Sequence, residues 1–189
     1  MPARTPALKA MTAAEKGELL DALLTDQPAL QTRVEALAAA RMSAADRGAV
    51  AEGVEFALRG LDLDQLSGRA GYRPGVGYVD PGEAADELLD EALQPFLDDL
   101  ARRGRLGMTT AAAECALGIL DGLYRCRAAG SASLLEYTPD YVVERASAVM
   151  VRCRALGVDL PVDDLVDLLP EWDAVLRPLG HLGDGRSLR

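Results

Sequence analysis

Histidine and cysteine, which carry much of the acid–base, nucleophilic and metal chemistry of proteins, are scarce in this sequence of 189 residues. The single histidine, His181, lies in the glycine-rich segment 180–189. We predict that this segment is a flexible tail, which is a poor place to organise a proton relay. One histidine cannot supply Ser–His or Cys–His catalysis elsewhere, nor the usual zinc and di-iron ligand sets. We therefore predict no catalytic residue, no metal site and no bound cofactor, and we favour a role other than catalysis.

The three cysteines, Cys115, Cys126 and Cys153, form no paired motif. Cys115 and Cys126 are eleven residues apart on one predicted helix, which places them on the same face but about 16 Å from each other. Two side chains at that separation cannot bind one metal ion. We expect all three cysteines to be buried as small hydrophobic side chains. An odd number of cysteines without paired spacing also favours a reducing cytoplasm.

Acidic side chains form two clusters along the chain. The first lies within 80–103 and contains Asp86 and Asp90, one helical turn apart. The second contains Asp159, Asp163, Asp164, Asp167, Glu171 and Asp173. Neighbouring aspartates such as Asp98 and Asp99 point to different faces of a helix, which argues against a divalent-cation site. We interpret the clusters first as solvated faces that favour solubility. The functional alternative is a contact surface for a basic partner, with Asp86 and Asp90 among its residues.

Segment 67–82 interrupts the helical pattern with five glycines and two prolines. This composition predicts a long loop. The loop presents Arg69, Tyr72, Arg73 and Tyr78, and Tyr and Arg are favoured at protein contact sites. We favour the simpler interpretation, in which the tyrosines anchor an irregular crossover onto the helices. The segment lacks the Gly-Lys-Ser/Thr end of a phosphate-binding loop and follows no predicted strand, so nucleotide binding is not expected.

Apolar residues repeat at helical spacing along most of the chain and predict about seven helices. The clearest starts are a capping box at Thr12–Glu15, a proline at Pro28, and the sequence Asp80–Glu83, which combines an acidic cap with proline. The predicted helices cover 12–25, 28–42, 43–61, 80–104, 109–123, 138–157 and 162–176. Short links imply antiparallel hairpins, arranged as a bundle or a short helical-repeat stack. We predict an all-α fold and a single helical domain over residues 1–189.

The last predicted segment, 162–176, is interrupted at Pro170 and is expected to form two short helices. It contains the only tryptophan, Trp172. We expect Trp172 to pin this segment to the core. The alternative is that Trp172 is an exposed anchor for a partner.

The charge balance excludes several classes of partner. The chain has 30 acidic and 20 basic residues, a formal net charge of −10. Such a chain is poorly suited to neutralise the phosphates of nucleic acid or to bind an anionic membrane. No window approaches eighteen consecutive apolar residues, so no membrane span is predicted. All but two of the basic residues are arginines, which together with the abundant alanine we attribute to a GC-rich bacterial genome.

From residue 47 to 157 the chain resembles the helical region of a poorly characterised bacterial family that often accompanies a zinc-binding SWIM module. The resemblance begins with Val50–Glu52, which opens a helix that ends in a basic residue, Arg59. It continues with an aromatic-Val-Asp sequence before a long helix, Tyr78–Asp80, and with basic residues and glycine at the end of that helix, Arg102–Gly104. An alanine-rich helix follows.

Two features depart from that family's pattern. The acidic turn that follows its alanine-rich helix is absent, since the chain here reads Cys-Arg-Ala-Ala-Gly-Ser at 126–131. The zinc module is absent as well, because the chain contains no Cys-x-Cys pair. The resemblance therefore implies a fold of stacked helical hairpins and implies no known reaction.

These observations favour a non-enzymatic interaction or scaffold module that binds a protein partner, basic in character, through its acidic surfaces. Homo-oligomerisation remains open. The alternative is a small-ligand-binding bundle whose apolar pocket, lined by leucine, Met150 and tyrosine, is gated by the loop 67–82. An enzyme that uses only carboxylates, Tyr and Arg, and an acidic mimic of nucleic acid, are less favoured.

Overall fold

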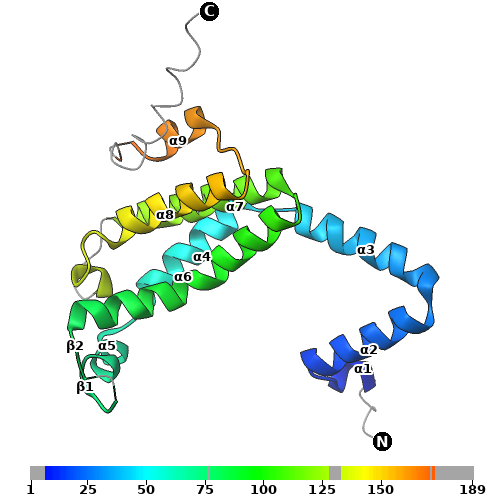
Figure 1. Ribbon diagram of the computed structural model, residues 1–189, viewed down its shortest axis with the longest axis horizontal. Helices are drawn as coiled ribbons and strands as arrows, with labels where there is room; N and C mark the ends of the chain where they lie inside the picture. The colour runs from blue at the N-terminus through cyan, green and yellow to red at the C-terminus, as the bar shows by residue number, and fades with distance from the viewer. Residues whose placement is uncertain (1–6, 76, 128–132, 171, 173–189) are drawn as a thin grey trace, which may run out of the picture. The chain divides into compact units, whose positions relative to one another are not determined.

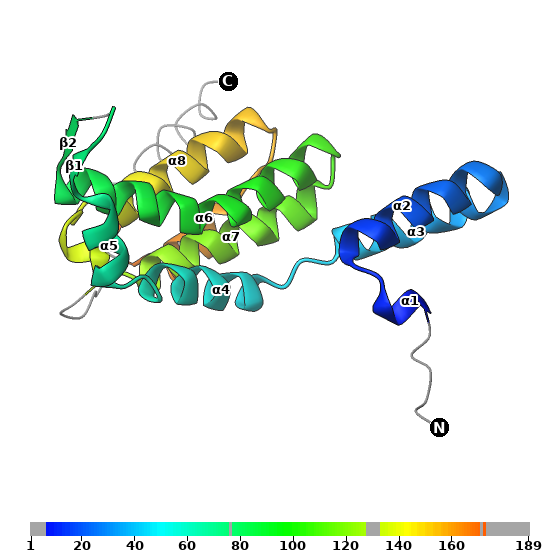
Figure 2. The same cartoon turned by 90° about the horizontal axis from the view of Figure 1, so that it is seen from below.

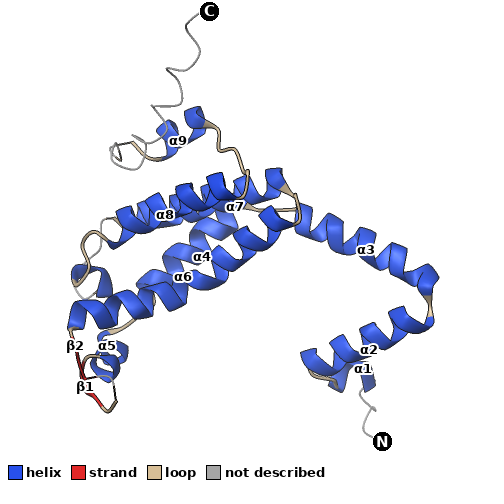
Figure 3. Cartoon of the chain, viewed as in Figure 1, coloured by secondary structure: helices blue, strands red, loops and turns tan. Residues whose placement is uncertain are grey.

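The computed structural model describes residues 7–75, 77–127, 133–170 and 172, and for Val162 and Asp163 it describes the backbone only. These residues form nine α-helices, one 3-10 helix and one two-stranded antiparallel sheet, shown in Figure 3. The prediction of an all-α fold is confirmed. There are more helices than the seven predicted, because the shortest helices are too short to show the repeated apolar spacing from which a helix is predicted. No helix in the described part of the chain has the length and apolar character of a membrane span.

Contacts between residues divide the chain into two compact units, Met1–Met42 and Ser43–Arg189, where the sequence suggested one domain. The first unit contains α1 (Ala7–Ala10), α2 (Ala13–Asp26) and all of α3 (Pro28–Ser43) except its last residue. The predicted capping box is confirmed: the Thr12 backbone N–H donates to a Glu15 carboxylate oxygen at 2.7 Å, and the Glu15 N–H donates to the Thr12 hydroxyl at 3.3 Å. Figure 1 shows α2 and α3 diverging from the link between them.

The second unit is a helical bundle with a small sheet beside it. Its elements are α4 (Arg47–Arg59), α5 (Leu63–Arg69), β1 (Gly71–Arg73), β2 (Gly77–Val79), α6 (Pro81–Arg105), α7 (Thr109–Arg125), the 3-10 helix η1 (Leu134–Glu136), α8 (Tyr141–Ala155) and α9 (Val162–Leu168). Helix α7 contacts α4, α6 and α8, and ten of its residues are buried. In Figures 1 and 2 α6 and α7 lie side by side. Their short link makes them antiparallel, as predicted.

Two glycines bring α7 very close to α4. A Cβ atom added to Gly122 would lie 2.6 Å from the Val54 Cβ and 2.7 Å from the Ala51 carbonyl oxygen. One turn earlier, a Cβ atom on Gly118 would lie 2.7 Å from the Val50 Cβ. Gly118 and Gly122 therefore have room only for a hydrogen atom in place of a side chain. The two glycines set the distance between α7 and α4.

The prediction of a long loop over 67–82 was wrong. Helix α5, begun by a capping box of Asp62 and Gln65, continues to Arg69, and β1 and β2 then form a hairpin. Glycine supplies the left-handed backbone of the hairpin turn, since Gly75 has a φ of +83°. Of these glycines and prolines, Gly71 and Gly77 lie in the strands and Pro74 and Gly75 in the turn, whereas Gly68 belongs to α5 and Pro81 and Gly82 to α6. Helix α6 begins at Pro81 with Asp80 as its cap, as predicted.

Candidate functional site

The hairpin presents two tyrosines to solvent. Tyr72 on β1 pairs directly with Tyr78 on β2, so both side chains project from the same face of the sheet. Their exposed fractions are 80% and 72%. The next residue, Val79, projects to the opposite face and is buried. This corrects the interpretation that the tyrosines anchor the segment, because Val79 fills that role and the tyrosine rings stay free. We call this surface the tyrosine face.

The two arginines of this region attach it to α6. The Arg69 guanidinium donates two hydrogen bonds of 2.7 Å to the carboxylate of Glu91. Arg73 donates to Glu87 at 3.2 Å. The hydrogen bond from Arg69 holds the pKa of Glu91 below its ordinary value. Arg73 thus links β1 of the hairpin to α6, and Arg69 links the preceding helix α5 to it, through ion pairs that are partly open to solvent.

Asp90, predicted as a contact residue, links α6 to α8. The Arg145 Nε and Nη2 atoms each lie 2.7 Å from an Asp90 carboxylate oxygen. The Tyr141 hydroxyl donates to the same carboxylate at 3.0 Å. Burial, together with the charge of Asp90, raises the pKa of Tyr141, so this hydroxyl stays protonated. The Asp90 carboxylate therefore binds groups within the fold and does not lie unpaired at the surface.

Asp86 lies one turn before Asp90 on the same side of α6. Partial burial raises the pKa of Asp86, and the carboxylates of Asp90 and Glu144 raise it further, against the opposing effect of Arg145. Folding therefore makes the neutral form of Asp86 more favourable than it is in the unfolded chain. Its ionised carboxylate costs stability once the pH rises through this raised pKa.

Replacing Asp86 with asparagine should stabilise the protein at pH 7 by about 0.5 kcal/mol, the size of one like-charge pair on a helix. The gain should vanish when the pH falls below the ordinary aspartate pKa, because Asp86 is then neutral in both folded and unfolded chains. Urea unfolding at pH 7 and pH 3 measures both effects. Asp98→Asn on the same helix is the matched control, since Asp98 is exposed and an asparagine oxygen can still accept the hydrogen bond from Gln94. A loss of stability in Asp86→Asn at pH 7 would contradict the prediction.

Trp172 is 7% exposed and packs edge-to-face on Tyr124, with ring centroids 5.2 Å apart. The Tyr124 hydroxyl donates to the Pro170 carbonyl oxygen at 2.7 Å. The expectation that Trp172 pins the last segment to the core is confirmed. Its inclusion among partner-contact residues is corrected, because a ring buried in this way has no free face to offer.

The second acidic cluster is only partly described. Asp159 is exposed, and Asp164 lies 3.8 Å from Arg47. The side chain of Asp163, and all of Glu171 and Asp173, lie outside the described residues, as do His181 and the predicted tail 180–189. No group of three His, Cys, Asp or Glu side chains in the described part of the chain is arranged to hold a metal ion.

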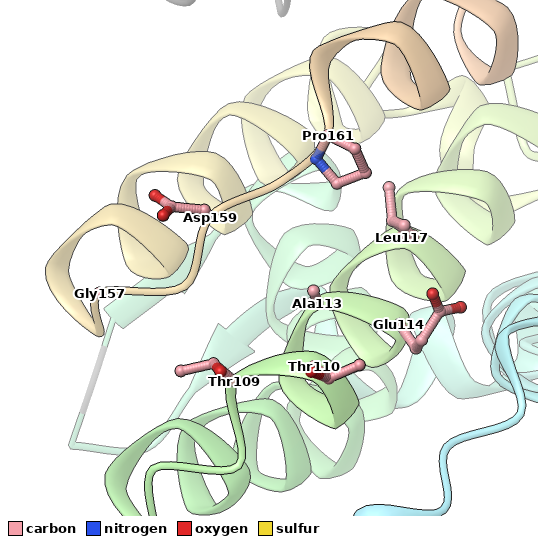
Figure 4. Close-up of a pocket in the computed structure, with 8 residues that line it drawn as sticks. All are labelled: Thr109, Thr110, Ala113, Glu114, Leu117, Gly157, Asp159 and Pro161. Atoms are coloured by element: carbon pink, nitrogen blue, oxygen red, sulfur yellow. The ribbon is translucent and has the colours of Figure 1, made fainter.

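A cavity of about 380 Å³ lies between the start of α7 and the segment that connects α8 to α9. It is lined in part by Thr109, Thr110, Glu114 and Asp159. Figure 4 shows the Asp159 and Glu114 carboxylates well apart, so they do not converge on one point. Neither Met150 nor any residue of 67–82 lines this cavity, or two further cavities of about 160 and 370 Å³. The predicted pocket gated by 67–82 has no counterpart among these three.

The three cysteines are free and buried, as expected. Burial raises the pKa of Cys115 and of Cys126 to about 11 and that of Cys153 to about 12. Their thiols are therefore protonated at neutral pH and serve as packing groups.

Glu87 and Glu91 were missing from the predicted site, although they hold its arginines. The sequence did contain a signal for this pairing, because Arg69 and Arg73 are followed by a helix rich in acidic residues. The distance between these groups depends on how the chain turns at the hairpin, which composition does not reveal. Arg145 was missed for a similar reason, because its partner lies on another helix.

The chain was compared with protein-family models, curated proteins and solved structures. None of the three comparisons found a match. The resemblance to the helical region found beside SWIM modules stays a prediction.

Proposed function

We propose that this chain is a non-enzymatic interaction module that docks a basic segment of a partner protein on the tyrosine face. The observation that carries the proposal is the exposure of Tyr72 and Tyr78, side by side on a hairpin that Arg73 links to Glu87 of α6. Tyrosine rings offer large contact areas and lose little conformational entropy on binding. A support held in place reduces that entropy cost further.

Charge selects the chemistry of the partner. Residues 1–42 contain five basic and five acidic residues, so the net charge of −10 lies entirely in residues 43–189. The segments that flank the hairpin contribute exposed carboxylates at Asp62, Asp64, Asp80 and Glu83. Such a surface attracts Arg and Lys side chains and repels acidic ones.

Cation–π contacts between arginine and tyrosine occur within the chain itself. The Arg127 guanidinium carbon lies 3.8 Å from the centre of the Tyr124 ring. That of Arg145 lies 5.1 Å from the centre of the Tyr141 ring. An arginine of a partner could contact Tyr72 or Tyr78 in the same way, because both rings are exposed.

Peptide display against the full chain tests the proposal, with basic, neutral and acidic sequences in one library. The selected peptides should be rich in arginine and lysine, and their affinity should fall as salt is added. Changing Tyr72→Ser and Tyr78→Ser together should weaken binding by at least roughly tenfold, the scale of contact hot spots.

Tyr137→Ser is the matched control, since Tyr137 is also exposed, at 46%, but lies outside the hairpin. It should leave binding unchanged, and all variants should unfold at the wild-type temperature. Selection of neutral or acidic peptides would overturn the proposal, as would equal binding by the double variant.

We further place this module in a bacterial cytoplasm. The arginine-for-lysine bias and the abundant alanine of the sequence support a bacterial source. The three free, buried thiols are compatible with a reducing compartment.

A further inference from the structure

The helices of the first unit expose the apolar side chains that usually form a core. No residue of α1, α2 or α3 is buried. Leu19, Leu20 and Leu23 on α2 are 38%, 44% and 41% exposed, and Leu37 on α3 is 62% exposed. Helices of 14 and 16 residues are marginal in water without packing against an apolar face. The leucines therefore require a cover, which α2 and α3 do not give each other because they diverge (Figure 1).

We infer that the cover is the same unit of a second copy of the chain, so that two helix pairs form a four-helix bundle. This surface is separate from the tyrosine face and does not depend on it.

Charge favours a second copy as the occupant. Residues 1–42 have no net charge, so two copies meet here without the repulsion that the strongly acidic remainder of the chain would cause. Along α2 the charged residues are four acids and one lysine, whereas along α3 they are two arginines and one glutamate. A two-fold interface needs a surface that complements itself. Placing α2 of one copy against α3 of the other meets that need.

The exposed apolar side chains suit the core of such a bundle. Leu19, Leu20 and Leu23 on α2 and Leu30 and Leu37 on α3 are all exposed, so two copies would bring ten leucines to the centre of four helices.

The mass of the full chain in solution, followed over a range of concentrations by light scattering, tests the inference. We expect twice the 20.0 kDa mass of one chain at high concentration. Leu19→Glu with Leu23→Glu should raise the dissociation constant by roughly a hundredfold or more, since two buried leucines are lost. Leu19→Ala with Leu23→Ala should act in the same direction while retaining the helix, because alanine is the best helix former.

The matched control introduces the same charges outside the first unit, at Leu106→Glu and Val151→Glu, which are 56% and 66% exposed. This control should dimerise like the wild type. A single-chain mass at every concentration overturns the inference. So does a dimer that survives both leucine variants, or one that the control disrupts equally.

Discussion

Replacing Gly122 with alanine should destabilise residues 43–189 by about 2 kcal/mol, although alanine favours a helix more than glycine does. The added methyl group would lie 2.6 Å from the Val54 Cβ and 2.7 Å from the Ala51 carbonyl oxygen. Both are close to the α4 backbone, so no side-chain rotation relieves the clash and the two helices must separate. Separation opens gaps in the core that α7 shares with its neighbours. Urea unfolding followed by circular dichroism measures the loss.

Gly68→Ala is the matched control. Gly68 lies within α5, and a Cβ atom there would have no atom within 4 Å. This change should stabilise the same unit by about 0.5–1 kcal/mol through helix propensity alone. If both variants gain stability to the same extent, α4 and α7 do not approach as closely as described.

Removing the Trp172 side chain should cost about 3 kcal/mol, as is usual when a buried aromatic residue is replaced by alanine. The change Trp172→Ala removes the ring that packs on Tyr124. It should also weaken the hydrogen bond that the Tyr124 hydroxyl donates to the Pro170 carbonyl oxygen. Because Trp172 is the only tryptophan, unfolding must be followed by circular dichroism rather than by fluorescence.

Trp172→Phe tests whether the stability depends on an aromatic ring at this position. Phenylalanine retains an aromatic face for Tyr124, so this variant should lose less than half as much stability. Equal stability of Trp172→Ala and the wild type would show that the last segment is not held by this contact.

Helix starts were predictable because their signals are local. Thr12 and Glu15 cap α2 by bonds between residues three apart, and Asp80 caps α6 within two residues. Such bonds need no information from the rest of the chain. The general apolar spacing predicted the bundle for the same reason, because a stripe identifies the buried face of its own helix.

The features that were missed depend on pairing over longer distances. Whether Tyr72 faces the core or the solvent is decided by its register with Tyr78. The glycines around Tyr72 suggested a loop, because a glycine-rich strand and a loop have the same amino-acid composition. Leu19, Leu20 and Leu23 of α2 have the spacing of a buried stripe, yet they are exposed. A stripe shows that a helix has an apolar face but does not show what covers it.

The close contact between α4 and α7 has a consequence for how the chain is made. Arg59, at the end of α4, donates a hydrogen bond of 2.8 Å to the carbonyl oxygen of Arg125, at the end of α7. During synthesis α4 leaves the ribosome well before its partner exists, whereas α6 and α7 follow one another directly. The local pair α6–α7 can therefore assemble first, since short loops close at little entropic cost. Before α7 is made, α4 has only α6 to pack against, and the core closes when α7 is added.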